Sequence, residues 1–269
     1  MRKAQVWLAV LFAVIVGAAL VIYLTSIGGD NRNAIINIFF LIPPFIAVLA
    51  GVTAVHTYGV DNIHGKALAL ITLGLAAWFV GEAFWAVYEL ILKSDPFPSI
   101  ADVFYLAAYP LMLWGIFTEL YHYKVDISLV RSLFLSTFSI VLSILVYNLS
   151  ILPSLHQNVP LVANLIAASY GLGDVVLIMM IAHLLMLTLD FKGGRLNRAW
   201  MCILFGVIFM LLGDIFFALY REHYENATNL YRSIDLLWVA SYLSFAWGLL
   251  DIHFVIQGVQ NKVRSLLAS

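Results

Sequence analysis

Eight long stretches of the chain consist mostly of apolar side chains, and each is at least 18 residues long. A helix needs about 20 such residues to cross the hydrocarbon core of a bilayer. Backbone polar groups inside a bilayer are satisfied only in helices or closed barrels, and continuous runs of this length favour helices. We therefore predict eight membrane-spanning helices, near residues 5–26, 34–58, 67–92, 100–121, 130–152, 160–189, 198–221 and 233–257.

The composition agrees with a membrane protein and excludes several other classes. Of the 269 residues, 63% are hydrophobic and 11% are charged, whereas soluble domains contain about 45–50% apolar and about 25% charged residues. The formal net charge of −1 lacks the basic excess typical of nucleic-acid binding. The single cysteine, Cys202, excludes an internal disulfide and a Cys-based metal site. The segments between the runs are too short for a kinase, cyclase or nucleotide-binding domain, so we expect one all-α membrane domain.

The distribution of Lys and Arg predicts the orientation of the helices. The basic start resembles a signal peptide, but the apolar run behind it is long enough to span, so we interpret it as a retained helix. The side that holds both termini carries ten basic residues, namely Arg2, Lys3, Lys66, Lys124, Arg131, Lys192, Arg195, Arg198, Lys262 and Arg264. The other side carries four, namely Arg32, Lys93, Arg221 and Arg232. Because cytoplasmic loops are enriched in Lys and Arg, we predict a cell-membrane protein with both termini in the cytoplasm.

Two parts of the sequence match each other in order. The segment "GEAFWAVYEL" at 81–90 corresponds to "GDIFFALYRE" at 213–222, and "DVFYLAAYPLMLWG" at 102–115 corresponds to "DLLWVASYLSFAWG" at 235–248. The offsets, 132 and 133 residues, are nearly equal. Chance similarity among apolar segments is the alternative. We predict two parallel four-helix repeats, 1–126 and 127–269, related by a pseudo-twofold axis along the membrane normal.

Several polar residues occur at matching positions of the two halves. Glu82 and Asp214 lie inside the third and seventh apolar runs, where a carboxylate at the helix centre costs at least about 2.5–3.5 kcal/mol unless it faces a polar interior. We therefore predict an acidic cavity that opens to the outside, is lined by both halves and binds a small ligand or ion. The predicted binding residues, with no catalytic residue among them, are Glu82, Asp214, Asp174, Asp102, Asp235, Asn37, Asn164, Tyr88, Tyr220, Tyr109 and Tyr242.

A purely structural role is the alternative for these acids. Tyr88, Tyr109, Tyr220 and Tyr242 are candidate hydrogen-bond partners that would hold the helices together. Arg221 is a further candidate partner of Asp214, although seven positions separate them on one helix. The remaining pair, Asp102 and Asp235, begins two helices, where capping and the helix dipole favour a carboxylate.

The second and sixth runs contain residues that weaken helices. Pro43 and Pro44 lie inside the second run, and Gly171 and Gly173 lie beside Asp174 in the sixth. Proline removes a helical donor and glycine loosens a helix. We expect both helices to be interrupted at similar depth, as in transporters whose binding site lies between repeats.

His56 and His183 occupy matching positions near the cytoplasmic ends of the second and sixth runs. Two such histidines are capable of holding a haem or a metal ion. Ordinary interfacial histidines are the simpler interpretation, and no cofactor is specified. No hydrolase, P-loop or dinucleotide-binding motif occurs in the chain, so an enzyme is only a minor alternative.

The segment "PSIADVFYLAAYPLMLWGI" at 98–116 resembles a motif in the multi-pass N-terminal membrane regions of bacterial diguanylate cyclases and histidine kinases. The residues that match are Pro98, Ser99, Ala101, Asp102, Phe104, Tyr105, Leu106, Tyr109, Pro110 and Leu111. The resemblance implies a sensory membrane domain. The sequence given departs from it because only about a dozen residues follow the eighth run, so we expect a separate signalling partner.

Two functions therefore remain open at this point. The first is sensing of a ligand or ion by a protein that acts through a partner. The second is a small secondary transporter or ion pathway that uses the same carboxylates. We expect the lipid bilayer as the surrounding medium and no nucleic-acid partner.

Overall fold

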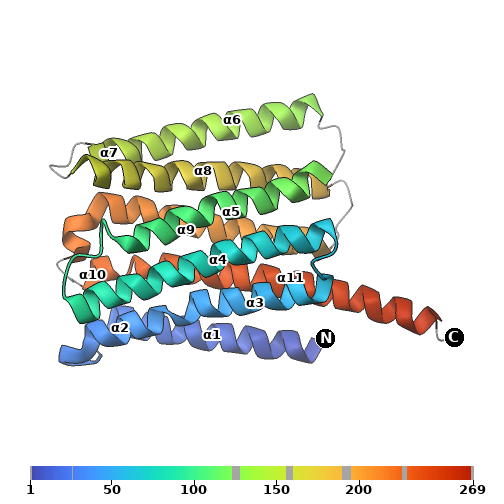
Figure 1. Ribbon diagram of the computed structural model, residues 1–269, viewed down its shortest axis with the longest axis horizontal. Helices are drawn as coiled ribbons and strands as arrows, with labels where there is room; N and C mark the ends of the chain where they lie inside the picture. The colour runs from blue at the N-terminus through green and yellow to red at the C-terminus, as the bar shows by residue number, and fades with distance from the viewer. Residues whose placement is uncertain are drawn as a thin grey trace.

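The computed structural model describes residues 2–25, 27–122, 128–155, 160–189, 195–225 and 229–267. Within these ranges the chain is helical apart from short turns (Figure 1). The elements are α1 (Arg2–Leu24), η1 (Gly29–Asn31), α2 (Arg32–Phe40), α3 (Ile42–Tyr58), α4 (Ile63–Val87), η2 (Tyr88–Leu92), α5 (Ile100–His122), α6 (Leu129–Val146), η3 (Tyr147–Ile151), α7 (Leu152–Leu155), α8 (Leu161–Leu189), α9 (Arg195–Glu225), α10 (Asn229–Arg232) and α11 (Asp235–Leu267).

Eight helical segments are long and apolar enough to cross a membrane. They are Gln5–Leu24, Gly29–Tyr58, Ile63–Leu92, Ile100–Tyr121, Leu129–Ile151, Leu161–Met186, Leu196–Arg221 and Asp235–Leu267. Each corresponds to one predicted run, so the prediction of an all-α chain with eight helices long and apolar enough to span a membrane is confirmed. The largest difference is at the last helix, whose end lies ten residues beyond the predicted 257.

The long helices lie side by side, with both termini at the same end of the bundle (Figure 1). We call this the terminal end and the opposite one, which holds α2, α7 and α10, the distal end. Six helices form a closed ring, because each contacts the next in the order α3, α4, α5, α8, α9, α11 and back to α3. α1 packs against α11, and α6 packs against α8. The last turns of α11 project beyond the bundle at the terminal end.

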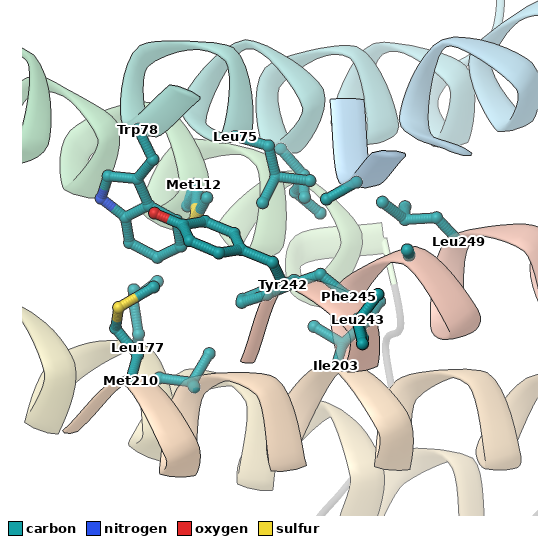
Figure 2. Packing of buried hydrophobic residues seen from close by; sticks show 14 of the residues in the cluster. Leu75, Trp78, Met112, Leu177, Ile203, Met210, Tyr242, Leu243, Phe245 and Leu249 are labelled. Atoms are coloured by element: carbon teal, nitrogen blue, oxygen red, sulfur yellow. The ribbon is translucent and has the colours of Figure 1, made fainter. Parts of the chain in front are cut away.

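The centre of the ring is filled by apolar and aromatic side chains. Figure 2 shows Tyr242 of α11 beside Trp78 of α4, and their rings are edge-on with centroids 6.2 Å apart. Leu75, Met112 and Phe245 lie close by and are almost fully buried. This apolar packing closes the interior on the side of the terminal end.

The second predicted span is interrupted as expected, whereas the sixth is not. α2 ends at Phe40, and α3 begins at Ile42 with Pro43 and Pro44 in its first turn, where the missing backbone donors do no harm. In contrast, α8 runs without a break from Leu161 to Leu189, so the predicted interruption at Gly171 and Gly173 is wrong. Those glycines allow close packing instead: a Cβ at 171 would meet Val146, and one at 173 would overlap the ring of Tyr109.

Two ion pairs lie near the terminal end. His64 of α4 and Glu119 of α5 are 2.8 Å apart. Arg198 of α9 contacts Asp251 of α11 through two hydrogen bonds, of 2.7 and 2.5 Å. Glu119 and Asp251 are both buried. Each pair therefore fastens two neighbouring helices at the same end of the bundle.

Candidate functional site

A partly enclosed cavity of about 110 Å³ lies inside the distal half of the ring. On this measure a single water needs roughly 10–15 Å³, so the cavity has room for several waters or a small organic molecule. Its walls come from α2, α4, α5, α8, α9, α10 and α11, together with Phe97 and Ser150. Both halves of the sequence therefore contribute to one site.

Glu82 lines the cavity from α4 and accepts two hydrogen bonds from phenols. The hydroxyl of Tyr105 on α5 lies 2.8 Å from Oε2, and the hydroxyl of Tyr242 on α11 lies 2.7 Å from Oε1. The carboxyl group thus joins three helices. Both donors are uncharged, so neither supplies a counter-ion.

Asp214 lines the cavity from α9 and accepts a 2.9 Å hydrogen bond from the indole of Trp238. Trp238 occupies the sequence position that matches Tyr105, so matching donors serve matching carboxyls. A glycine beside each carboxyl residue allows the donor ring to pack closely against its helix. A Cβ at Gly81 would come within 2.5 Å of the Tyr105 ring, and a Cβ at Gly213 within 2.5 Å of the Trp238 indole.

Asp174 lies behind the cavity wall rather than on it. The side chain is fully buried, and its Oδ1 accepts a 2.8 Å hydrogen bond from the hydroxyl of Tyr109. No N–H or O–H donor reaches its Oδ2, and the neighbouring carboxyl group of Asp214 is close enough to share a proton with it. A buried oxygen in this state requires a proton, a water molecule or a cation.

Asp102 combines capping with contact to the cavity. Its Oδ2 accepts the backbone N–H of Ser99 at 2.6 Å, while the hydroxyl of Ser99 accepts the N–H of Ala101 at 3.1 Å. This reciprocal arrangement is a capping box, so the predicted structural role is confirmed. Oδ1 accepts a 2.5 Å hydrogen bond from Tyr170 of α8, and both side chains line the cavity.

Asp235 and Arg232 close the cavity at the distal end. Tyr224 donates a 2.6 Å hydrogen bond to Asp235 and accepts a 2.9 Å hydrogen bond from Arg232. Burial raises the pKa of the Tyr224 phenol, and the nearby Asp235 raises it further, so the hydroxyl keeps its proton and remains a donor. Arg232 also contacts Glu89 at 2.5 Å and Asn33 at 3.0 Å.

The second arginine of the cavity has other partners than the predicted one. Arg221 donates hydrogen bonds of 3.1 Å to Asp95 and to the carbonyl of Phe97. Its guanidinium lies 4.5 Å above the centre of the Phe97 ring. The donor to Asp214 is Trp238 rather than Arg221.

The structure brings most of the predicted binding residues together. Those that line the cavity are Glu82, Asp214, Asp102, Asp235, Asn37, Asn164, Tyr109 and Tyr242. Tyr88, at the start of η2, and Tyr220, which is 40% exposed beside Phe216 and Tyr231, are not among the lining residues.

Sequence reasoning did not select five polar or aromatic side chains that hold the acids. They are Tyr105, Tyr170, Tyr224, Trp238 and Arg232. The matched pair Tyr105 and Trp238 was detectable in the alignment of the two halves. Arg232 entered the prediction only as a loop charge, because nothing local indicates that its side chain turns inward.

The histidines considered for haem or metal lie away from the cavity. His56 is exposed on α3, and His183 is partly buried on α8. Neither lines the cavity. Among the residues that the structure describes, no group of three or more His, Cys, Asp or Glu side chains is placed to hold a metal ion.

Comparisons with protein-family models, curated proteins and solved structures find no match to this chain. The geometry of the cavity is therefore the basis for a functional conclusion.

Proposed function

We propose that this multi-pass membrane protein binds a small ligand or ion in the cavity of the distal half. One observation carries the proposal: four carboxyl groups, of Glu82, Asp102, Asp214 and Asp235, line one cavity of about 110 Å³. A helix bundle that needed only hydrogen bonds between helices would not require such a space beside its acids, since protein interiors are close-packed.

Sensing is the function that we favour. Binding in the cavity would alter contacts among α4, α5, α9 and α11, since Glu82 and Asp214 lie on α4 and α9 and their donors lie on α5 and α11. A change in helix packing is a means of passing the signal to a partner protein at the terminal end. The motif at 98–116 supports this reading, because Asp102, Tyr105 and Tyr109 of that motif all line the cavity.

We further propose that the chain consists of two parallel four-helix repeats. The helix contacts support this. If α3, α4 and α5 of the first repeat correspond to α8, α9 and α11 of the second, the contacts of α3 with α4 and α11 match those of α8 with α9 and α5. The contact of α4 with α5 likewise matches that of α9 with α11. Three pairs of glycines at matching positions, Gly74/Gly206, Gly81/Gly213 and Gly115/Gly248, support it as well. A Cβ at Gly115 would meet the Ala67 carbonyl, as one at Gly248 would meet that of Ala199, at 2.7 Å in both cases.

The orientation is also part of the proposal. We place the terminal end in the cytoplasm and the cavity toward the outside of the cell membrane. The excess of Lys and Arg in the loops and tails at the terminal end supports this orientation.

A secondary transporter or ion pathway is the second candidate. Two observations favour it: the break between α2 and α3 lies beside Phe40, which lines the cavity, and Asp174 extends the acidic groups one layer deeper. Interrupted helices and buried acids are common at transport sites.

The test is thermal unfolding of the purified protein against a panel of inorganic cations, organic cations, amino acids, lipids and pH values. The variant Glu82→Gln/Asp214→Asn retains hydrogen-bond acceptors but removes two carboxylates. A ligand that raises the Tm of the wild type and not of the variant supports the cavity as a binding site. The control is Glu119→Gln, because that carboxyl lies at the terminal end and should leave the ligand response unchanged.

If no ligand acts and the double variant only melts earlier, the acids are structural and the proposal falls. Flux measurements in proteoliposomes then separate the two candidates. Uptake of the stabilising ligand that depends on Glu82 indicates transport, whereas binding without flux indicates sensing.

A further inference from the structure

We propose that the ligand of the cavity is a small organic cation, such as an amine or a quaternary ammonium compound. This inference rests on the proposed function and specifies the chemical class that the site would bind. It combines the aromatic walls of the cavity, the absence of charged donors to two of its acids, and the pairing of its own arginines.

The walls are unusually aromatic for a cavity that contains so many acids. Eleven of the 25 lining residues are aromatic, so rings rather than aliphatic side chains form most of the apolar surface. They are Phe40, Trp78, Trp85, Phe97, Tyr105, Tyr109, Tyr170, Phe217, Tyr224, Trp238 and Tyr242. Ring faces attract cations, and cages of aromatic rings recognise quaternary ammonium groups.

Glu82 and Asp214 receive hydrogen bonds from phenols and an indole, which carry no charge. The two lining arginines are already engaged by acids outside the lining, Arg232 by Glu89 and Arg221 by Asp95. These two carboxyl groups at the centre of the cavity therefore have no side-chain counter-ion of their own. A ligand with a positive charge would supply it.

The cavity already contains two examples of the expected contact. The guanidinium of Arg221 lies 4.5 Å from the Phe97 ring centre, and that of Arg232 lies 4.7 Å from the Tyr224 ring centre. Both rings belong to the cavity wall. Two aromatic rings of the wall thus already pack against positively charged guanidinium groups of the protein itself.

A further carboxyl group, that of Asp174, lies beside Asp214 behind the cavity wall. Asp174 is fully buried, and no N–H or O–H donor reaches its Oδ2, but the carboxyl group is close enough to Asp214 for the two acids to share a proton. A cation in the cavity beside Asp214 would stabilise both carboxyl groups.

A bare metal ion fits the site less well than an organic cation. Hard cations such as Ca²⁺ take about six to eight oxygen ligands at close range. Here the carboxyl groups are distributed over four helices and several of their oxygens already accept hydrogen bonds from Tyr or Trp. Within the described part of the chain, no cluster of three His, Cys, Asp or Glu side chains is arranged for a metal.

The test uses choline, tetramethylammonium and butylammonium as probes, with the uncharged carbon isostere of choline, in which a tert-butyl group replaces the trimethylammonium group. Binding to purified wild-type protein is followed by calorimetry and by the fluorescence of the cavity tryptophans. We expect saturable binding of at least one cation, and binding of the isostere that is about tenfold weaker or more. This comparison requires no variant, so it does not depend on how any substitution folds.

Two variants locate the binding. Glu82→Gln should weaken binding of the cation, while Glu119→Gln should not. Phe217→Leu removes a ring that contacts Trp85, Phe97, Tyr224 and Trp238. This variant should weaken binding of the cation more than binding of the isostere. Equal loss for both probes would indicate a simple apolar pocket and would overturn the inference.

The remaining outcomes separate this inference from the proposed function. Binding that depends on Glu82 but is specific for a neutral compound, an anion or an inorganic cation overturns the proposal of an organic cation. It leaves the proposal of a binding cavity standing. Equal affinity for choline and its isostere also overturns the organic cation. If none of these probes and no compound of the thermal-unfolding panel binds, both the organic-cation proposal and the binding-cavity proposal fall.

Discussion

Arg232 donates a hydrogen bond of 2.5 Å to the carboxylate of Glu89, which lies 143 positions earlier in the chain. Arg232 is buried at the end of α10, and the Glu89 side chain is only 12% exposed in η2. Two further hydrogen bonds reach Glu89, from Asn37 at 2.8 Å and Trp85 at 3.0 Å. This ion pair therefore joins the first and second halves of the sequence beside the cavity at the distal end.

Arg232→Gln should destabilise the protein strongly, because Glu89 would remain buried without its cation. Breaking one side of a buried ion pair typically costs about 3–5 kcal/mol. The measurement is unfolding in mixed detergent micelles. The double variant Arg232→Met/Glu89→Leu removes both charges and should recover a large part of the loss. A double variant as unstable as the single one would show that the pair has no special role.

Gly81→Ala and Gly213→Ala should each destabilise the bundle by about 1–3 kcal/mol, because overpacking forces a neighbouring ring to move. The rings are Tyr105 and Trp238, which donate to Glu82 and Asp214. Ligand response should therefore fall together with Tm. Gly17→Ala is the matched control, since a Cβ there meets no atom within 4 Å, and its Tm should stay the same or rise slightly.

Tyr105→Phe and Tyr242→Phe each remove one of the two phenolic donors to Glu82. We expect a loss of about 1 kcal/mol for each variant, in line with the net value of a single hydrogen bond. The double variant leaves Glu82 with neither donor and should lose more than the sum, since the carboxyl is then unsatisfied. A double-variant cycle measured by thermal unfolding provides the comparison, and strict additivity would argue against a shared acceptor.

The orientation is testable with single cysteines in a Cys202→Ser background. Asp61→Cys lies in the turn between α3 and α4 at the terminal end, and Ser94→Cys lies after η2 at the distal end. Both native residues are exposed. A membrane-impermeant maleimide added to intact cells should label only Ser94→Cys. Labelling of Asp61→Cys alone would reverse the orientation and place the cavity toward the cytoplasm.

The helices and much of the cavity wall were predictable because they depend on local pattern. Apolar length fixes a spanning helix whatever its neighbours, and the prolines after Phe40 act on their own segment. Glu82 and Asp214 stood out because an acid within an apolar run needs a polar surrounding. Each of these inferences uses residues close together in the chain.

The details that failed depend on contacts between distant segments. The glycines of α8 look like helix breakers alone, yet they make room for Tyr109 and Val146 from α5 and α6. Arg232 looks like a loop charge, but its partners Asn33 and Glu89 belong to the first half of the chain. Tyr88 and Tyr220 match in sequence, but neither belongs to the cavity wall, which depends on how the helices rotate in the bundle.

The ion pairs at the terminal end have a mechanical consequence. They fasten α4 to α5 near His64 and α9 to α11 near Arg198, at the end opposite the segments that connect these helices, so each helical hairpin is tied at both ends and would tilt as one unit. A helix of about 25 residues is roughly 37 Å long, and a tilt of about 5° about its terminal end would move its distal end by roughly 3 Å. The same tilt would barely move the terminal end. Small rotations of the hairpins would therefore open or narrow the mouth of the cavity while the packing at the terminal end stays almost still.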